Sequence, residues 1–300
     1  MLDAIAKKLR LLASVPKLAW KSDPVEYYDF LGDDVVEGES DKSNPTTNPL
    51  WLNLGFWESA RTYPEAAEAM ARLVADAAQL GPSDALLDVG FGFGEQDFYW
   101  LERFGVKHIT GLNISPMQVE RTQKRAQERG LQDRMTLGVG SATEMPYADA
   151  SFDKVTALEC AHHFQTRERF FAEAFRVLRP GGRLALADGV PSPGHKPISL
   201  TTRLVLRHWA SPVENYYDRQ VYAEKLKASG FTNVTCRSIA QGVFPGIIKY
   251  SDYRRSGRSM AEAVVELSPE DIEQATKRTE PFGITDYIIV SAQKPGLPSA

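Results

Sequence analysis

Short apolar runs alternate with helical stretches from residue 64 to residue 190, and this alternation restricts the fold more than any other feature of the chain. Residues 64–80 place apolar side chains on one helical face, and further helices are predicted at about residues 94–104, 115–129 and 167–178. The apolar runs that predict strands are residues 85–90, 108–113, 135–140, 152–159 and 182–190. Strands that alternate with helices predict a parallel sheet covered by helices on both faces.

The pattern after Pro191 is less regular. A helix at residues 221–231 is followed by two further predicted strands, at residues 233–241 and 285–293. Residues 191–220 and 242–284 are expected to be helical insertions that form a lid. We therefore predict an α/β fold whose doubly wound, seven-stranded, mostly parallel sheet lies within residues 64–300. Residues 1–63 are expected to form a helical cap with a mobile loop.

The first 21 residues carry five lysines and arginines against a single aspartate. Leu2, Ile5, Leu9 and Leu12 fall near helical spacing, so a helix here would have one apolar and one basic face. Two interpretations stay open: a helix packed on the domain or over its active site, and an interfacial helix that contacts anionic membranes. Residues 33–49 are acidic and rich in turn formers, which predicts a loop.

The charge balance excludes one broad class of function. The chain has 35 Lys and Arg against 39 Asp and Glu, so it lacks the net basic character that non-specific nucleic-acid binding needs. Its two cysteines, Cys160 and Cys236, are too few for a disulfide framework or a structural zinc site, and no metal site is predicted. Because no run reaches roughly 18 apolar residues and no secretory signal is present, we expect a cytoplasmic protein.

Three glycines follow the first predicted strand and open the next predicted helix, within residues 88–95, Asp-Val-Gly-Phe-Gly-Phe-Gly-Glu. Gly90 and Gly92 let the backbone turn tightly near a ligand, and Gly94 starts a helix whose free N–H groups favour an anionic group. Glu95 stands where a dinucleotide fingerprint has its third glycine. The loop therefore favours a ligand with a smaller negative group over a nicotinamide or flavin cofactor.

Several stretches resemble motifs of the class I S-adenosylmethionine-dependent methyltransferases. They are LLDVGFGFG (86–94), ITGLNIS (109–115), ATEMPYADASFDKV (142–155) and FRVLRPGGRLALAD (175–188). The upstream LNLGFW (52–57) resembles a segment of the small-molecule subgroup, which includes enzymes that methylate antibiotic sugars, polyketides and tocopherols. The resemblance covers over half of the chain, and it implies S-adenosylmethionine as cofactor and a small-molecule acceptor.

The resemblance also implies which residues hold the cofactor. The residues expected around its methionine half are Asn53, Trp57, Asp88, Gly90, Gly92 and Gly94, and those expected around its adenosine half are Asn113, Ile114, Ser141 and Ala142. Backbone N–H groups of the glycines would meet the carboxylate, while Asp88 would bind near the amino group or brace the turn. The family usually has an acid at the place of Asn113; an amide can still accept one ribose hydroxyl proton and donate to the other oxygen.

Residues that directly follow the fourth predicted strand are the candidates for proton transfer. In a doubly wound sheet, ligands bind outside the carboxyl ends of the strands, and Glu159-Cys-Ala-His162-His163 begins at that point. A hydroxyl acceptor must lose its proton, and histidine is suited to accept it at neutral pH. We predict His163 ahead of His162 as this base, with a structural histidine as the alternative. Glu159 is a second candidate, either to accept a proton or to hold an amine acceptor.

Aromatic residues are frequent in the N-terminal region and the two insertions, which suits a bulky, largely apolar acceptor such as a polyketide, terpenoid, aromatic or lipid. The residues predicted to contact this acceptor are Tyr63, Trp209, Tyr216 and Tyr250. The alternative is that these aromatics only seal the lid against the sheet.

Three functions follow from these observations, and the first is the leading hypothesis. It is a methyltransferase that acts on oxygen of a natural product, as a monomer or homodimer. The second is a methyltransferase that acts on carbon or nitrogen of a lipid or isoprenoid acceptor, with residues 1–21 at a membrane surface. The third is a cofactor-binding partner without catalysis, which Asn113 and Ser141 keep open because both replace acids that are usual in the family.

Overall fold

The computed structural model describes residues 50–195, 197–208, 210–256, 264–279 and 283–297. The predictions for residues 1–21 and 33–49 lie outside the described residues, and so does the predicted acceptor contact Trp209. The described part includes the strands and the helices that the sequence predicts from residue 64 onward.

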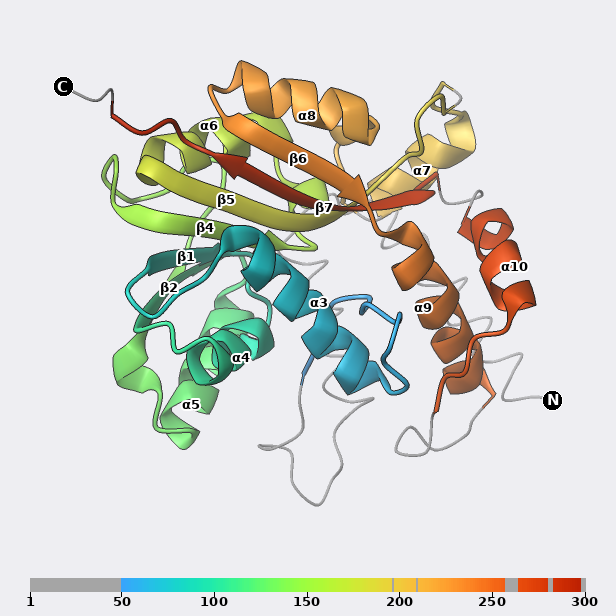
Figure 1. Cartoon of the computed structure of the whole chain (residues 1–300), viewed down its shortest axis with the longest axis horizontal. Coiled ribbons are helices and arrows are strands. Elements are labelled where there is room, and N and C mark those ends of the chain that lie inside the picture. Colours follow the sequence, from blue (N-terminus) through green and yellow to red (C-terminus); the bar gives the residue numbers. More distant parts are fainter. Residues whose placement is uncertain (1–49, 196, 209, 257–263, 280–282, 298–300) are drawn as a thin grey trace.

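Seven strands form one sheet in the described part of the chain (Figure 1). They are β1 (Ala85–Val89), β2 (His108–Asn113), β3 (Met135–Val139), β4 (Phe152–Leu158), β5 (Leu178–Val190), β6 (Thr232–Ser238) and β7 (Asp286–Gln293). Their order is β3-β2-β1-β4-β5-β7-β6. Strands β1 to β5 are mutually parallel, and β7 runs antiparallel to both β5 and β6. The predicted doubly wound, mostly parallel sheet is confirmed.

Helices cover both faces of this sheet (Figure 1). One face packs against α3 (Tyr63–Ala78), α4 (Glu95–Arg103), α5 (Pro116–Glu128) and α9 (Ala240–Arg255), and the other against α6 (Arg167–Val177) and α8 (Arg219–Ala228). Two further helices, α7 (Leu200–His208) and α10 (Pro269–Thr279), belong to the late insertions, and α10 packs beside α9. The predicted two-sided covering of the sheet is therefore present.

Alternate residues of the central strands pack into different cores, because successive side chains of a strand point to opposite faces. In β5, Leu184 and Leu186 belong to the core under α6 and α8, whereas Ala185 and Ala187 belong to the core under α3 and α4. Both faces of the strand are thus buried. This explains why the central strands are continuous apolar runs rather than alternating ones.

The start of α3 is fixed by local sequence. The Thr62 side chain accepts a hydrogen bond from the Glu65 N–H, and the Glu65 carboxylate accepts one from the Thr62 N–H, which together make a capping box. Pro64 in the first turn supplies the backbone angle that a helix needs. This cap places Tyr63 and the segment before it, residues 50–57, against the end of the sheet.

The late insertions differ from their predicted extents. The segment 191–220 contains one α-helix, α7, followed by a 3₁₀ turn at Val213–Asn215. Strand β6 ends at Ser238 and α9 begins at Ala240, so the second insertion starts slightly earlier than expected. The Ile239 N–H still donates to the Tyr287 carbonyl oxygen (2.7 Å), which ties the start of α9 to β7. Among the described helices, none has the length and apolar character needed to cross a bilayer.

Candidate active site

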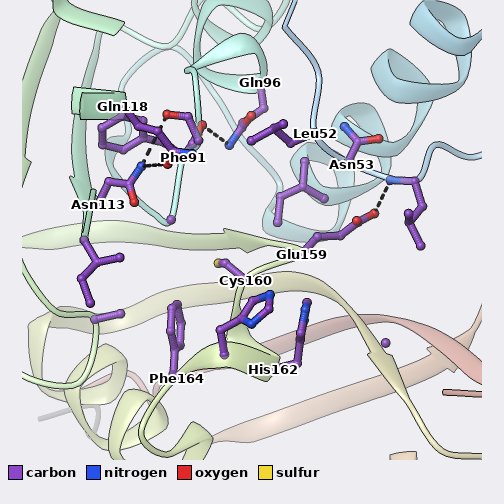
Figure 2. A pocket seen from close by; sticks show the side chains of 18 of the residues that line it. Leu52, Asn53, Phe91, Gln96, Asn113, Gln118, Glu159, Cys160, His162 and Phe164 are labelled. Atoms are coloured by element: carbon purple, nitrogen blue, oxygen red, sulfur yellow. Dashed lines mark hydrogen bonds between the residues drawn. The ribbon is translucent and has the colours of Figure 1, made fainter. Parts of the chain in front are cut away.

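A cavity of about 480 Å³ lies where the carboxyl ends of β1 to β5 meet (Figure 2). Gly90 follows β1, Asn113 ends β2, Ser141 follows β3, Glu159 follows β4 and Gly189 lies near the end of β5; all five line the cavity. The antiparallel β7 contributes Tyr287, its second residue, to the lining at the same edge. The sheet changes winding direction between β1 and β4, which is where open α/β sheets bind their ligands.

The glycine turn after β1 forms one wall of this cavity. Gly90 and Gly92 line it with φ values of +69° and +57°, a backbone region that residues with a Cβ rarely adopt. A Cβ on Gly90 would lie 2.6 Å from the Cys160 Cβ, and one on Gly92 would lie 2.8 Å from Leu52 Cδ1. Both positions therefore need glycine for conformation and for space.

The structure corrects the predicted role of the turn's N–H groups. The Gly90 N–H donates to the Leu112 carbonyl oxygen (2.8 Å), and the Gly94 N–H donates to that of Phe91 (2.9 Å). Both donors are used within the fold, so neither is available for a ligand carboxylate as predicted. Gly94 also does not line the cavity; its φ of +75° serves the start of α4.

Asp88 is fully buried beneath the turn and does not line the cavity. Its carboxylate accepts hydrogen bonds from Thr156 Oγ1 (2.7 Å) and Gln96 Nε2 (3.1 Å), and Gln96 also donates to the Phe91 carbonyl oxygen. Burial raises the pKa of Asp88 to about 7. Of its two predicted roles, this geometry supports bracing the turn. Asp97, equally buried beside it, has its pKa raised by burial and by the charge of Asp88.

An amide pair forms the wall at the end of β2 (Figure 2). Asn113 Nδ2 donates to Gln118 Oε1 (2.8 Å), which leaves the Asn113 Oδ1 as an acceptor. The Gln118 Nε2 donor is buried with no hydrogen-bond partner among the described residues, and Gln118 lines the cavity. One acceptor and one donor thus lie together in the wall. Sequence reasoning missed Gln118. The pattern that could have indicated it is a polar residue five positions after Asn113, in the first turn of the helix that follows β2.

The residues after β3 lie beside this amide pair. Ser141 and Ala142 line the cavity, as does Ile114, so three predicted contacts of the adenosine half come together. The Ser141 hydroxyl is paired with Thr143 Oγ1 (2.9 Å) and accepts from the Thr143 N–H (3.2 Å). This small turn holds the backbone of Ala142 at the cavity wall.

Residues 50–57, called the strap below, cross the cavity on its open side. Leu50, Leu52, Asn53 and Leu54 line the cavity. Asn53 is held by the Gly55 N–H, which donates to its Oδ1 (2.9 Å). Trp57 is buried against α9 and does not line the cavity, so its predicted place over the methionine end is corrected.

Glu159 is the one carboxylate among the described cavity-lining residues. Its Oε1 accepts a hydrogen bond from the Leu54 N–H (2.8 Å), and its φ of +55° is unusual for a residue with a side chain. Burial raises the pKa of Glu159 to about 7, aided by the charge of Asp188 and opposed by the nearby Tyr287 hydroxyl and by the hydrogen bond from the Leu54 amide.

His162 is held by a buried charge network that sequence reasoning missed. Its Nδ1 lies 2.8 Å from Asp188 Oδ1, and Asp188 Oδ2 accepts from Arg167 Nε (2.9 Å). Burial acts to raise the pKa of Asp188, but Arg167 and His162 together hold that pKa below its ordinary value. An ionised carboxylate only accepts, so the His162 Nδ1 carries a hydrogen, and in the neutral ring the lone pair is on the Nε2.

Arg167 is in turn anchored by Asn215. The Asn215 side chain accepts from the Arg167 N–H (2.9 Å) and donates to the carbonyl oxygens of His162 (3.1 Å) and Phe164 (2.8 Å). The Arg167 guanidinium also donates to the Gly189 carbonyl oxygen (3.1 Å). The loop that carries His162 is therefore fixed from both sides. The sequence signal was an acid, Asp188, at the end of an otherwise apolar strand.

His163 also lines the cavity, with its ring centroid 3.8 Å from that of His162. The His162 ring is hydrogen-bonded to the buried carboxylate of Asp188. The predicted ranking of His163 ahead of His162 is therefore not supported by this geometry. The short 3₁₀ turn Ala161–His163 sets which ring faces Asp188, and residue spacing alone does not show this.

The three predicted acceptor contacts that the structure describes lie away from the cavity lining. Tyr63 and Tyr250 stack on each other with ring centroids 4.9 Å apart, and the Tyr63 hydroxyl donates to the carbonyl oxygens of Trp51 and Asn53. Tyr216 lies against His195 next to a much smaller hollow. These aromatics support the walls. The cavity lining also includes Phe164, Gly189, Phe244, Thr279, Ile284 and Tyr287. We call this part of the lining the acceptor end, because it is where an acceptor is expected. The described residues contain no group of three or more His, Cys, Asp or Glu that could hold a metal ion.

The strand order, the glycine turn and the donor–acceptor wall at the end of β2 define the nucleoside-binding fold of class I methyltransferases. The family described as Methyltransferase domain matches residues 87–186. The chain is 34% identical to erythromycin 3''-O-methyltransferase of Saccharopolyspora erythraea, over 86% of this chain and 88% of that protein. It is 32% identical to 27-O-demethylrifamycin SV methyltransferase of Amycolatopsis mediterranei, over 82% of this chain and 92% of that protein. The chain belongs to the class I S-adenosylmethionine-dependent small-molecule methyltransferases.

Solved structures agree on the fold. The 4+2 cyclase SpnF matches with a TM-score of 0.67 at 23% identity, over 90% of this chain and 93% of that one. Geranyl diphosphate C-methyltransferase from Streptomyces coelicolor matches with a TM-score of 0.65 at 18% identity, over 88% of this chain and 97% of that one. At such identities the likeness concerns architecture alone, and one of the two proteins is named a cyclase.

The residues present fit S-adenosylmethionine. The unpaired Gln118 Nε2 and the Asn113 Oδ1 offer a donor and an acceptor, which is what a pair of ribose hydroxyls requires. The cavity volume lies within the range of small-molecule sites.

Proposed function

We propose that this methyltransferase transfers a methyl group to a hydroxyl oxygen of a bulky, largely apolar natural product, with His162 as general base. The single observation that carries the proposal is the hydrogen bond between His162 Nδ1 and the buried Asp188, which leaves the Nε2 for an acceptor proton. The names of the two relatives that span most of the chain, one an O-methyltransferase of erythromycin and one that acts on 27-O-demethylrifamycin SV, support an oxygen acceptor.

The bound cofactor supplies an activated methyl group on a sulfonium. The chain's own residues then have two tasks, to align the acceptor oxygen and to exclude water. The glycine turn and the strap enclose one end of the cavity, and Phe244, Ile284 and Tyr287 form apolar walls at the other. Apolar walls of this extent suit an acceptor that buries much of its surface.

Proton removal falls to His162 in this proposal. The acceptor hydroxyl donates to the Nε2, and the proton moves to this atom as the oxygen attacks. The imidazolium that forms is stabilised by Asp188, whose charge is already held by Arg167 in the buried network.

The experiment uses the full chain with S-adenosylmethionine and two acceptors, 27-O-demethylrifamycin SV and erythromycin lacking its 3''-O-methyl group. Transfer is followed as the mass gain of one methylene and as release of the demethylated cofactor. H162Q is expected to lower kcat by about 10²–10⁴-fold, while H163Q, the matched control on the neighbouring ring, lowers it by less than about tenfold. An H162Q protein that binds cofactor and keeps wild-type kcat overturns the assignment of the base.

A nitrogen acceptor is the second candidate, and Glu159 is the observation that favours it. A carboxylate in a cavity whose described lining contains neither Lys nor Arg attracts a cationic amine. Once the ammonium group has lost its proton, the neutral amine attacks the methyl group without a general base. Turnover on such an acceptor therefore survives H162Q. It falls in E159Q, because the carboxylate that attracts the amine is absent. The membrane-surface alternative depends on residues 1–21, which lie outside the described residues. The non-catalytic alternative is tested by the same transfer assay.

A further inference from the structure

Two carboxylates hold the strap through its backbone. The Leu50 N–H donates to Glu95 Oε1 (2.8 Å), and the Leu54 N–H donates to Glu159 Oε1 (2.8 Å). Two further backbone N–H groups of the strap donate to carbonyl oxygens of α3 and α9, that of Phe56 to Ala66 and that of Trp57 to Gly242. The two carboxylates are therefore what attach the strap to the ligand-binding edge of the sheet.

The Glu95 attachment belongs to the cofactor side. Glu95 opens α4 directly after the glycine turn, and its buried carboxylate is paired with Arg125 of α5 and with Arg129, the C-cap residue of that helix. Arg125 also donates to the Phe93 carbonyl oxygen (3.0 Å), so the turn, α5 and Leu50 share one network. This end of the strap is fixed to the element that carries the glycines.

The far end of the strap is fixed to the acceptor side. A Cβ on Gly246 of α9 would lie 2.0 Å from Trp57 Cγ, and one on Gly242 would lie 2.3 Å from the Phe56 ring. These two glycines are four residues apart and so lie on one face of α9, where they receive both rings. The same helix carries Phe244, which lines the acceptor end of the cavity. The strap thus connects the glycine turn to α9.

Glu159 lies between these two ends. It directly follows β4, with a positive φ that brings its carboxylate up to the Leu54 N–H across the cavity (Figure 2). Leu52 packs against Gly92 on one side of this bond, and Leu54 lines the cavity. We propose that Glu159 is a positioning residue, whose carboxylate sets the height of the strap above the cavity and so the alignment of methyl donor and acceptor.

This role differs from that of a proton acceptor and from that of an amine ligand, and the difference is chemical. Glutamine keeps an acceptor oxygen for the Leu54 N–H but has no charge, while leucine and alanine remove the acceptor. A positioning role is therefore preserved in E159Q and lost in E159L and E159A. A proton acceptor or an amine ligand would be lost in all three variants. The proposal rests on the proposed function only where KM and kcat of methyl transfer are measured.

The experiment measures amide hydrogen exchange of residues 50–57 in the full chain without ligand, alongside KM and kcat. E159L is expected to speed exchange at Leu54 by about 10–100-fold, the loss of one hydrogen bond to a charged acceptor, while E159Q changes it by less than about fivefold. In the transfer assay, E159L raises KM more than it lowers kcat, and E159Q restores both to within about threefold of wild type. E159A repeats the exchange measurement should E159L fail to fold.

The matched control is D153A. Asp153 Oδ2 accepts from the Ala85 N–H (2.8 Å), the same kind of bond at the opposite end of β1. D153A should speed exchange near Ala85 and leave residues 50–57 unchanged. Wild-type exchange at Leu54 in both E159L and E159A overturns the proposal. Absence of methyl transfer by wild type, with the exchange pattern as predicted, instead contradicts the proposed function alone.

Discussion

The two ends of the cavity are built in different ways. The cofactor end uses backbone: a glycine turn with positive φ values, carbonyl and N–H groups at strand ends, and buried side chains such as Asp88 and Gln96 that brace them. The acceptor end uses side chains from β7, α9, α10 and the loops near them, and these helices are tied by partly exposed ion pairs such as Arg278–Asp252 and Lys249–Asp271.

This difference separates what is common to the fold from what is particular to this chain. Backbone geometry at strand ends tolerates few substitutions, because a Cβ or a lost carbonyl bond disturbs the sheet itself. Helices that pack beside the sheet can change their side chains without altering the strand order. The cofactor end therefore indicates the family, and the acceptor end is where we expect the substrate preference to be set. Replacing a buried group should accordingly lower the free energy of unfolding strongly, whereas replacing a partner of an exposed ion pair at the acceptor end should lower it little.

Arg167 is the position where the largest loss of stability is expected. Its guanidinium is buried and offsets the charge of Asp188, so R167M leaves a buried carboxylate without its partner. Breaking a buried ion pair on one side costs about 3–5 kcal/mol, measured here as the free energy of unfolding in urea. Asp188 then titrates at a higher pKa, because Arg167 is the main charge that lowers it.

R169M is the control for this prediction. Arg169 lies on the same helix but is exposed, so its replacement should change the free energy of unfolding by less than about 0.5 kcal/mol. Adding D188N to R167M should recover part of the loss, because the unpaired charge is then absent. Equal stability of R167M and R169M would contradict the contrast between buried and exposed charge.

G90A tests the backbone character of the cofactor end. Alanine at φ +69° is strained, and its Cβ would lie 2.6 Å from Cys160 Cβ. Together these effects should destabilise the fold by about 2–4 kcal/mol and abolish cofactor binding in calorimetry. G138A is the matched control, since Gly138 in β3 has ordinary φ and nothing within 4 Å of an added Cβ. A stable G90A protein that still binds cofactor contradicts the argument.

Sequence reasoning succeeded where local pattern decides the structure. Alternating apolar runs and helices predicted the sheet, and the three glycines marked the ligand edge at residues 90–94, because strand period and turn chemistry are local properties. It also placed Glu159, His162 and His163 at the cavity, because the carboxyl ends of parallel strands meet at one edge.

It failed where the outcome depends on tertiary contact. Asp188 lies 26 residues from His162 and 21 from Arg167, so no local pattern joins them. The order of the two histidines depends on how a 3₁₀ turn orients them. Tyr63 and Tyr250 were expected to contact an acceptor, but their rings stack on each other. Aromatic content predicted a buried lid and could not say which rings face the cavity.

Glu159 lies between the two ends of the cavity, and the pH dependence of stability tests how strongly it is buried there. Its folded-state pKa of about 7 exceeds the ordinary glutamate value, so between these values the folded state binds more protons and stability falls as pH rises. Relative to E159Q, wild type should lose about 2–3 kcal/mol of unfolding free energy from pH 5 to pH 8. The facing groups are Tyr287 of β7, Asp188 of β5, the neighbouring Cys160 and the Leu54 amide. A constant difference between the two proteins would contradict a raised pKa.

The smallest effect is expected at the acceptor cover. Arg278 of α10 contacts Asp252 of α9 with two hydrogen bonds, one of them 2.9 Å long, but both side chains are more than 40% exposed. Water and salt therefore screen the pair, and R278M should cost at most about 1 kcal/mol in the free energy of unfolding, less at high ionic strength. The same variant loosens α10 against α9, so the KM for the acceptor should rise about two- to fivefold while cofactor affinity stays unchanged, which titration calorimetry can check. A loss as large as that of G90A would mean that the acceptor end is as rigidly built as the cofactor end, and the difference between the two ends would not hold.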